Sequence, residues 1–238
     1  MSRSVALKTL LVAVLITVAV VGFVLLPRSD AETAAPQTKD VRAAEAEDKR
    51  PALLVVGDSL SAGYGLTDVA DGWVALLQGR LDDTGLPMRV VNASISGDTS
   101  AGGAARLPAA IERHQPQVVI IELGGNDGLR GLPLDVMQQN FESMINASQA
   151  IGAEVILFGM MIPPNYGERY TQAFIDQYKT LSSEFDTALV PFFLEDVALD
   201  ASLMQADGIH PNEQAQPIML NAVWPTIETV VRERLDTP

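Results

Sequence analysis

Short runs of aliphatic residues recur along the chain from residue 51 onward, and they predict β-strands. Between these runs, apolar residues return every three or four positions, which is typical of one face of a helix. The predicted strands cover residues 52–56, 88–92, 117–122, 154–158 and 188–192. The helical positions include Trp73, Leu76, Leu77 and Leu81 and, in the last segment, Ile218, Ala222, Ile227, Val230 and Val231.

Strand and helix alternate in this part of the chain, as they do in consecutive βαβ units. The apolar residues in these strands are continuous rather than alternating, which is typical of a parallel sheet buried on both faces. Right-handed crossovers then cover both faces with helices. We therefore predict a three-layer α/β/α sandwich with a central parallel sheet, in which ligands bind beyond the carboxyl ends of the strands.

The start of the chain carries a membrane-insertion signal. Residues 9–26 are uncharged and mostly aliphatic, with Arg3 and Lys8 before the run and Arg28 just after it. About 18 apolar residues is the lower limit for a membrane-spanning helix and exceeds the ~7–15 of a signal-peptide core, which favours a retained anchor. The small residues in Ser29-Asp30-Ala31 suit a signal peptidase, which favours cleavage. Both alternatives place the rest of the chain outside the cytoplasm, because the basic end stays inside.

A spacer follows this apolar run. Residues 28–50 are rich in Ala, Glu, Asp and Lys and contain little that could be buried, which predicts a flexible linker. The remaining length suits one large α/β domain. We expect three parts: a signal peptide or membrane anchor at 1–27, the linker at 28–50 and a single domain at 51–238.

Composition excludes several classes of function. A formal net charge of −14 repels nucleic acid, whose binding requires a basic face. The chain has no cysteine, so disulfides, thiolate zinc sites and a cysteine nucleophile are all excluded. Only two histidines are present, too few for a site with several imidazole ligands. A Mg²⁺ or Ca²⁺ site built from carboxylates alone stays open, although no EF-hand spacing is visible.

Glycine and polar residues follow the predicted strands, at the edge where ligands are expected. Taken singly, each block has a structural explanation, because Gly, Asn and Asp favour turns and helix N-caps. The G-x-S-x-G motif of other serine enzymes is absent because residue 61 is Ser, and no Gly-Lys pair supports a phosphate loop. The blocks are GDSL at 57–60, ASISGD at 93–98, GGND at 124–127 and DGIHPN at 207–212.

The two histidines differ in context. His114 lies at a polar helix end before Pro116, where an imidazole near the C-terminal dipole is structural. His210 follows Asp207 by three positions, so the carboxylate can hold one ring nitrogen and leave the other as a general base. Ser59, at a tight strand-to-helix turn, is the candidate nucleophile.

Acyl transfer also needs hydrogen-bond donors for the oxyanion of the tetrahedral intermediate. The backbone N–H of Ser59 is one candidate donor. Gly97 offers a second backbone N–H that no side chain shields, and the Asn126 side-chain amide offers a third. Together the blocks predict a serine hydrolase site at one edge of the sheet.

These blocks resemble those that define the SGNH, or GDSL, hydrolases. Ser59, Gly97, Asn126 and His210 match the four residues that name the family, and Asp207 matches its triad acid. More narrowly, GDSLSAGYG, VVNASISGDTS, ELGGNDGLRG, PPNYG and DGIHPN are similar to the bacterial thioesterase I, arylesterase and lysophospholipase group.

The resemblance implies a flavodoxin-like α/β/α domain at 51–238, no metal or cofactor, and hydrolysis of acyl esters and thioesters through an acyl-serine. It also implies export to the periplasm, with the apolar segment as leader or inner-membrane anchor. The long apolar run and spacer depart from what every relative would carry. We expect a monomer whose partner is a small-molecule or lipid acyl ester.

The substrate pocket must come from loops at the same edge. The predicted lining consists of Asp58, Tyr64, Leu129, Ile162, Pro163 and Tyr166. Other functions stay open: a carbohydrate deacetylase or acyltransferase on the same fold, a non-catalytic periplasmic binding module, or a metal-dependent hydrolase.

Overall fold

A computed structural model of the chain describes residues 48–236. The predicted leader and most of the predicted linker lie outside these residues. No helix in the part that is described is long and apolar enough to cross a membrane. Among the first residues described, Arg50 pairs with Asp48 and, at 2.6 Å, with Asp82, so the last residue of the predicted linker is paired with the domain.

Residues 48–236 contain a five-stranded parallel sheet with the order β2-β1-β3-β4-β5. The predicted parallel sheet is confirmed, and each strand is found within two residues of its predicted ends. The strands are β1 (Ala52–Gly57), β2 (Arg89–Asn92), β3 (Pro116–Glu122), β4 (Glu154–Phe158) and β5 (Ala188–Val190).

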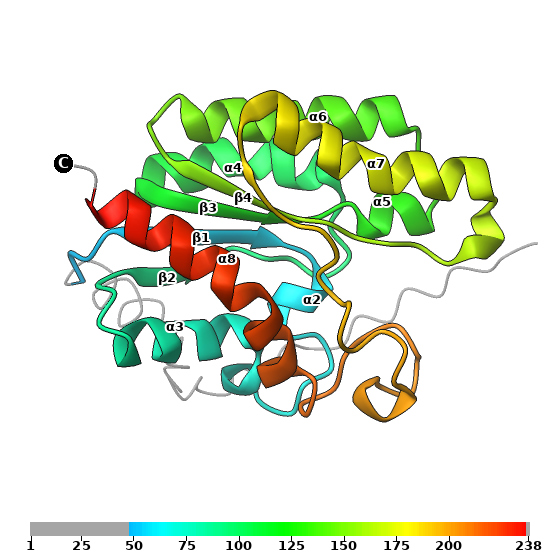
Figure 1. Ribbon diagram of the computed structural model, residues 1–238, viewed down its shortest axis with the longest axis horizontal. Coiled ribbons are helices and arrows are strands. Elements are labelled where there is room, and N and C mark those ends of the chain that lie inside the picture. The colour runs from blue at the N-terminus through cyan, green and yellow to red at the C-terminus, as the bar shows by residue number, and fades with distance from the viewer. Residues whose placement is uncertain (1–47, 237–238) are drawn as a thin grey trace, which may run out of the picture. The chain divides into compact units, whose positions relative to one another are not determined.

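Helices cover both faces of this sheet, as the three-layer prediction requires (Figure 1). The first face carries α3 (Trp73–Asp83) and α8 (Gln216–Asp236). The second carries α4 (Ser100–His114), α6 (Leu134–Gln149) and α7 (Glu168–Phe185). The short helices are α2 (Ser59–Ala62), α5 (Gly125–Leu129), η1 (Val69–Asp71), η2 (Pro164–Tyr166) and η3 (Ala201–Leu203).

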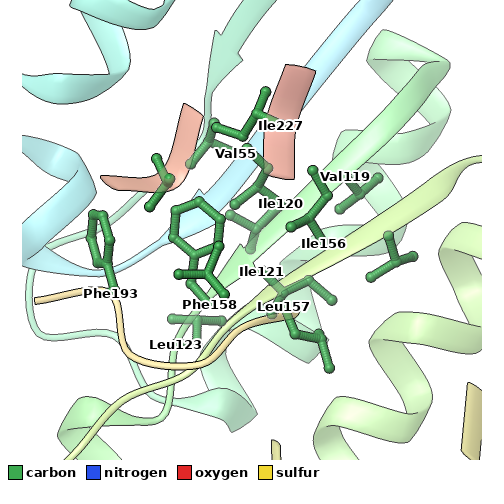
Figure 2. Packing of buried hydrophobic residues seen from close by; sticks show 14 of the residues in the cluster. Val55, Val119, Ile120, Ile121, Leu123, Ile156, Leu157, Phe158, Phe193 and Ile227 are labelled. Atoms are coloured by element: carbon green, nitrogen blue, oxygen red, sulfur yellow. The ribbon is translucent and has the colours of Figure 1, made fainter. Parts of the chain in front are cut away.

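The core between the sheet and the helices is built from the continuous apolar runs of the strands. Every residue of β1 is buried, and Ile120 and Ile156 on neighbouring strands are fully buried. Figure 2 shows strand residues such as Ile120 packed with Ile227 of α8. Burying a large aliphatic side chain is worth roughly 1.5–3 kcal/mol, so this interior stabilises the sheet that carries the loops.

An aromatic cluster anchors the last strand and the loop after it. The ring of Trp73 lies 5.3 Å from that of Phe193 and 5.6 Å from that of Phe158. The prediction carried the fifth strand to residue 192, but it ends at Val190, because Pro191 has no N–H to continue the ladder. Phe193 is buried in the loop after the strand.

Candidate active site

Ser59 lies at the first turn after β1, where the chain passes directly into helix α2. The Asp58 carboxylate caps this helix by accepting a hydrogen bond from Leu60 N–H at 3.0 Å. The Asp58 carbonyl accepts from Ala62 N–H at 2.9 Å, which closes the single turn. As the first helical residue, Ser59 presents a partly exposed hydroxyl and a backbone N–H beyond the carboxyl end of β1.

The structure brings Ser59, His210 and Asp207 together in one chain of hydrogen bonds. The Nε2 atom of His210 lies 2.9 Å from Ser59 Oγ, and its Nδ1 atom lies 2.6 Å from Asp207 Oδ2. An ionised carboxylate can only accept, so Nδ1 carries the proton and Nε2 offers its lone pair to the serine hydroxyl. This arrangement can abstract the hydroxyl proton.

Asp207 is held in its ionised form. Its Oδ1 atom accepts hydrogen bonds from the backbone N–H groups of His210 at 3.0 Å and Ile209 at 2.9 Å. These bonds, with the side-chain bond to His210, lower the pKa of Asp207 to about 2. The carboxylate therefore orients the imidazole throughout the neutral pH range.

The loop that carries His210 is tied to the loop after α2. Gln205 donates from Nε2 to the carbonyls of Tyr64 at 2.8 Å and Pro211 at 2.9 Å, and its backbone N–H donates to the His210 carbonyl at 2.7 Å. The Tyr64 ring lies against the imidazole with 4.6 Å between centroids. These contacts hold the His210 imidazole in position next to Ser59.

The two other predicted oxyanion donors lie on loops that adjoin this turn. Asn126 is in the first turn of α5, directly after β3, and its Nδ2 donates to Asp58 Oδ2 at 3.0 Å. Gly97 lies in the exposed loop after β2. Within residues 48–236, neither the Ser59 N–H nor the Gly97 N–H donates to another protein group, so both remain available to a substrate oxygen.

Arg106 holds the Gly97 loop against the serine turn. Its Nε atom donates to Asp98 Oδ2 at 2.7 Å, while its Nη atoms donate to the carbonyls of Ala93 and, at 3.1 Å, Gly57. One guanidinium thus joins the ends of β1 and β2. Sequence reasoning missed this residue, because nothing in the helical pattern of α4 marks which arginine faces the loops.

A pair of buried carboxyl groups lies beneath the site. Asp58 is 2% exposed and Glu122 is fully buried. Glu122 Oε2 accepts from Ser61 Oγ at 2.6 Å and from Asp58 N–H at 3.3 Å. Burial and the nearby Asp58 charge raise the pKa of Glu122 well above its ordinary value, which favours the protonated form of this carboxyl group. Its position in an otherwise apolar strand was the available sequence signal.

The predicted substrate residues other than Asp58 fall into two groups, one beside His210 and one beside α5. Tyr64 is half exposed beside His210. On the Asn126 side, Tyr166 donates its hydroxyl to the Leu129 carbonyl at 2.7 Å. Ile162, with 6% exposure, packs against Gly128 of α5 and supports this side from below. Pro163, the exposed residue before η2, begins the turn that carries Tyr166.

Asp58 differs from the other predicted substrate residues. Both of its carboxylate oxygens already accept hydrogen bonds from protein groups, and the side chain is buried. It therefore lies under the site rather than in its opening. Ser59, Tyr64 and His210 line one small hollow together.

The described residues hold no group of three or more His, Asp or Glu side chains arranged to bind a metal ion. His114 ends helix α4, at the position predicted for a structural role, and its carbonyl accepts from Arg89.

Comparison with known proteins agrees with this geometry. Residues 55–217 match the model of the GDSL-like lipase/acylhydrolase family. Esterase TesA of Pseudomonas aeruginosa is 58% identical over 179 residues, which cover 75% of this chain and 89% of that protein. The thioesterase 1/protease 1/lysophospholipase L1 of Escherichia coli strain K12 is 46% identical over 179 residues, covering 75% and 84%.

Solved structures give the same result. The crystal structure of TesA superposes with a TM-score of 0.73 at 57% identity, covering 75% of this chain and 99% of that one. The psychrotrophic esterase EstA from Pseudoalteromonas sp., in a structure inhibited by monoethylphosphonate, gives a TM-score of 0.72 at 43% identity, with 75% and 97% coverage.

Proposed function

The chain belongs to the GDSL-like lipase/acylhydrolase family, and we propose that it is a serine esterase and thioesterase that hydrolyses acyl esters through an acyl-Ser59 intermediate. The observation that carries this proposal is the 2.9 Å contact between His210 Nε2 and Ser59 Oγ, backed by Asp207. The relatives named esterase and thioesterase support the same activity.

Acylation begins when His210 Nε2 takes the proton of Ser59 Oγ as that oxygen attacks the acyl carbonyl carbon. The carbonyl oxygen gains negative charge and accepts hydrogen bonds from Ser59 N–H, Gly97 N–H and the Asn126 amide. Collapse of the tetrahedral intermediate expels the alcohol, phenol or thiol, which takes the proton from His210. Ser59 then carries the acyl group as an ester.

Deacylation repeats these steps with water as the nucleophile. His210 takes one proton from water, the hydroxide oxygen adds to the acyl carbon, and the same donors hold the oxyanion. The Ser59 oxygen leaves with the proton held by His210. The products are the free acid and the regenerated hydroxyl.

The rim of the site supports acyl substrates of broad type. Tyr64 beside His210, and the bonded pair Leu129 and Tyr166 on the α5 side, are all more than a third exposed, although they are large and apolar or aromatic. Such a rim suits an acyl chain, and the machinery itself recognises only a carbonyl. Phenol esters, thioesters and lysophospholipids are therefore all within the proposed range.

We further propose that the enzyme is exported and acts in the periplasm as a monomer, either freed by cleavage or anchored by its apolar N-terminal run. The support is the uncharged segment 9–26 preceded by Arg3 and Lys8. Immunoblotting of cell fractions tests this: recovery of the protein in the cytosol would contradict it.

Labelling with a fluorescent alkylphosphonate tests the central proposal. The reagent should modify the wild-type chain once, at Ser59, and should not modify Ser59→Ala. The labelled peptide is then identified by mass spectrometry. An unlabelled wild-type chain would favour a binding module instead. Loss of ester hydrolysis in EDTA would favour a metal-dependent hydrolase.

Substrate profiling separates the proposal from a carbohydrate deacetylase or acyltransferase. We expect turnover of 4-nitrophenyl esters and acyl-coenzyme A thioesters, with rates that vary with acyl-chain length. Faster release of acetate from acetylated sugars than from aryl acetates would contradict the proposal, as would acyl transfer to an added alcohol in preference to water.

A further inference from the structure

Asp58 is a buried charge that the hydrolytic steps above do not use. It is 2% exposed, and its two oxygens accept hydrogen bonds from Leu60 N–H and from Asn126 Nδ2. A buried carboxylate is costly unless hydrogen bonds compensate it. Capping one turn of helix needs only the Leu60 bond, which an uncharged Asn or Ser can accept equally well. The second bond therefore calls for another explanation.

That second bond determines which way the Asn126 amide faces. A side-chain amide has a donor NH₂ and an acceptor oxygen of nearly the same shape, and it can turn over in its site. An ionised carboxylate can only accept, so it binds the NH₂ end. One N–H of Asn126 then points to Asp58 at 3.0 Å, and the second N–H of the same nitrogen points elsewhere. The amide oxygen is kept away from Asp58.

The orientation matters because an oxyanion needs donors. If the Asn126 amide turned over, its oxygen would face the developing negative charge, and a stabilising contact would become a repulsive one. Both residues of this pair are positioned by secondary structure. Asp58 lies between the end of β1 and α2, and Asn126 lies in the first turn of α5.

We propose that Asp58 is a positioning residue of the hydrolytic reaction, which orients the Asn126 amide so that its free N–H is presented to the oxyanion. This inference rests on the proposed function. It replaces the earlier assignment of Asp58 as a substrate contact with a role exerted through Asn126.

The charges around Asp58 make the orientation of the Asn126 amide sensitive to pH. Burial raises the pKa of Asp58 to about 6, and the nearby Asp98 charge adds to this rise. The hydrogen bonds from Leu60 and Asn126 and the charge of His210 act in the opposite direction and lower the pKa. Glu122 packs beneath Asp58 from β3, and burial together with the Asp58 charge raises the pKa of Glu122 well above its ordinary value. Below about pH 6, Asp58 gains a proton and can donate to the amide oxygen, so it no longer selects one orientation.

A double-mutant cycle tests the proposal with an aryl ester at pH 8. Asn126→Ala removes the donor and should lower kcat by about 10²–10³-fold. Asp58→Asn keeps the shape but removes the acceptor-only group, and it should lower kcat by about 10- to 100-fold with little change in KM. Because Asp58 acts through Asn126, the double variant should be no slower than Asn126→Ala. Losses that multiply, or an unimpaired Asp58→Asn, would overturn the proposal.

Asp68→Asn is the matched control. Asp68 caps η1 by accepting from Ala70 N–H at 2.9 Å, the same local bond that Asp58 makes to Leu60, but it has no contact with Asn126. It should keep wild-type kcat. Phosphonate labelling reports on the triad separately: Asp58→Asn should still reach full labelling, more slowly, whereas failure of the proposed function would leave the wild type unlabelled.

The pH profile provides a second measurement that needs no Asp58 variant. In the wild type, protonation of Asp58 below about pH 6 should lower kcat by up to the loss seen in Asp58→Asn. In Asn126→Ala the orientation of an amide no longer matters, and this loss should be absent. The same dependence of kcat on pH in the two proteins would contradict the proposal.

Discussion

The Nε2 atom of His210 lies 2.9 Å from Ser59 Oγ, although 151 residues separate them in the chain. Because the two atoms form one proton-transfer pair, removal of either should disable the same step. We expect Ser59→Ala and His210→Ala each to lower kcat on an aryl ester by roughly 10⁴–10⁶-fold, and the double variant to be no worse. Full additivity of the two losses would mean that the residues do not act as a unit.

Asp207 orients the imidazole from the side opposite Ser59. Asp207→Asn can donate to Nδ1 and so favours the wrong tautomer, and we expect kcat to fall by about 10⁴-fold. Since the pKa of Asp207 is about 2, the carboxylate stays ionised as pH falls to 4. Any loss of activity between pH 7 and 4 should therefore occur without protonation of the Asp207 carboxyl group. NMR on a chain with labelled aspartate measures this ionisation directly. A carboxyl that titrates above pH 4 there would contradict this.

Glu122 should make the fold less stable as pH rises. The folded chain keeps Glu122 protonated above its ordinary value of 4.5, whereas the unfolded chain releases that proton, so the free energy of unfolding falls with pH by up to about 1.4 kcal/mol per unit. Glu122→Gln resembles the neutral form and removes this loss. We expect the free energy of unfolding, measured in urea, to shift in favour of Glu122→Gln relative to the wild type as the pH is raised from 5 to 8.

The exposed Glu154 at the start of β4 provides a control for that experiment. Glu154→Gln should leave the pH dependence of the wild type unchanged. A Glu122→Gln variant whose stability curve runs parallel to that of the wild type would show that Glu122 ionises normally in the folded chain.

The loop contact between Gly65 and Gln205 links stability to activity. Gly65 has φ of +75°, and an added Cβ would overlap the Gln205 side chain, which bonds to the Tyr64 and Pro211 carbonyls. We expect Gly65→Ala to lower the free energy of unfolding by about 1–2 kcal/mol or more and to lower kcat, because the His210 loop must shift.

Gly85 offers the matched variant. It has φ of +70° with open space around it, in the turn between α3 and β2. Gly85→Ala should show the backbone cost alone, with wild-type kcat. Thermal unfolding and ester hydrolysis measured on both variants distinguish the two effects. Equal kcat in both would show that Gln205 does not position the His210 loop.

Local pattern was enough to predict the sheet. Residues 155–158, for example, form a continuous apolar run between Gly152 and Gly159, and β4 contains this run. The same pattern placed the candidate residues Ser59 and Asn126 directly after strands, and parallel strands end at one edge, so their proximity followed from topology. These conclusions need only neighbours in the chain and the rules of strand packing.

Contacts between distant side chains could not be predicted in this way. Arg106 meets the carbonyls of Ala93 and Gly57, and Asp58 accepts from Asn126, 68 positions away. Hydrogen bonds depend on a few tenths of an ångström and on angle, and neither quantity is encoded in periodicity or composition. The sequence by itself determined the layered fold and the identity of the candidate nucleophile, base and acid. Only the tertiary structure decided that Asp58 lies beneath the site and holds an amide rather than a substrate, because burial and partner come from how separate loops pack together.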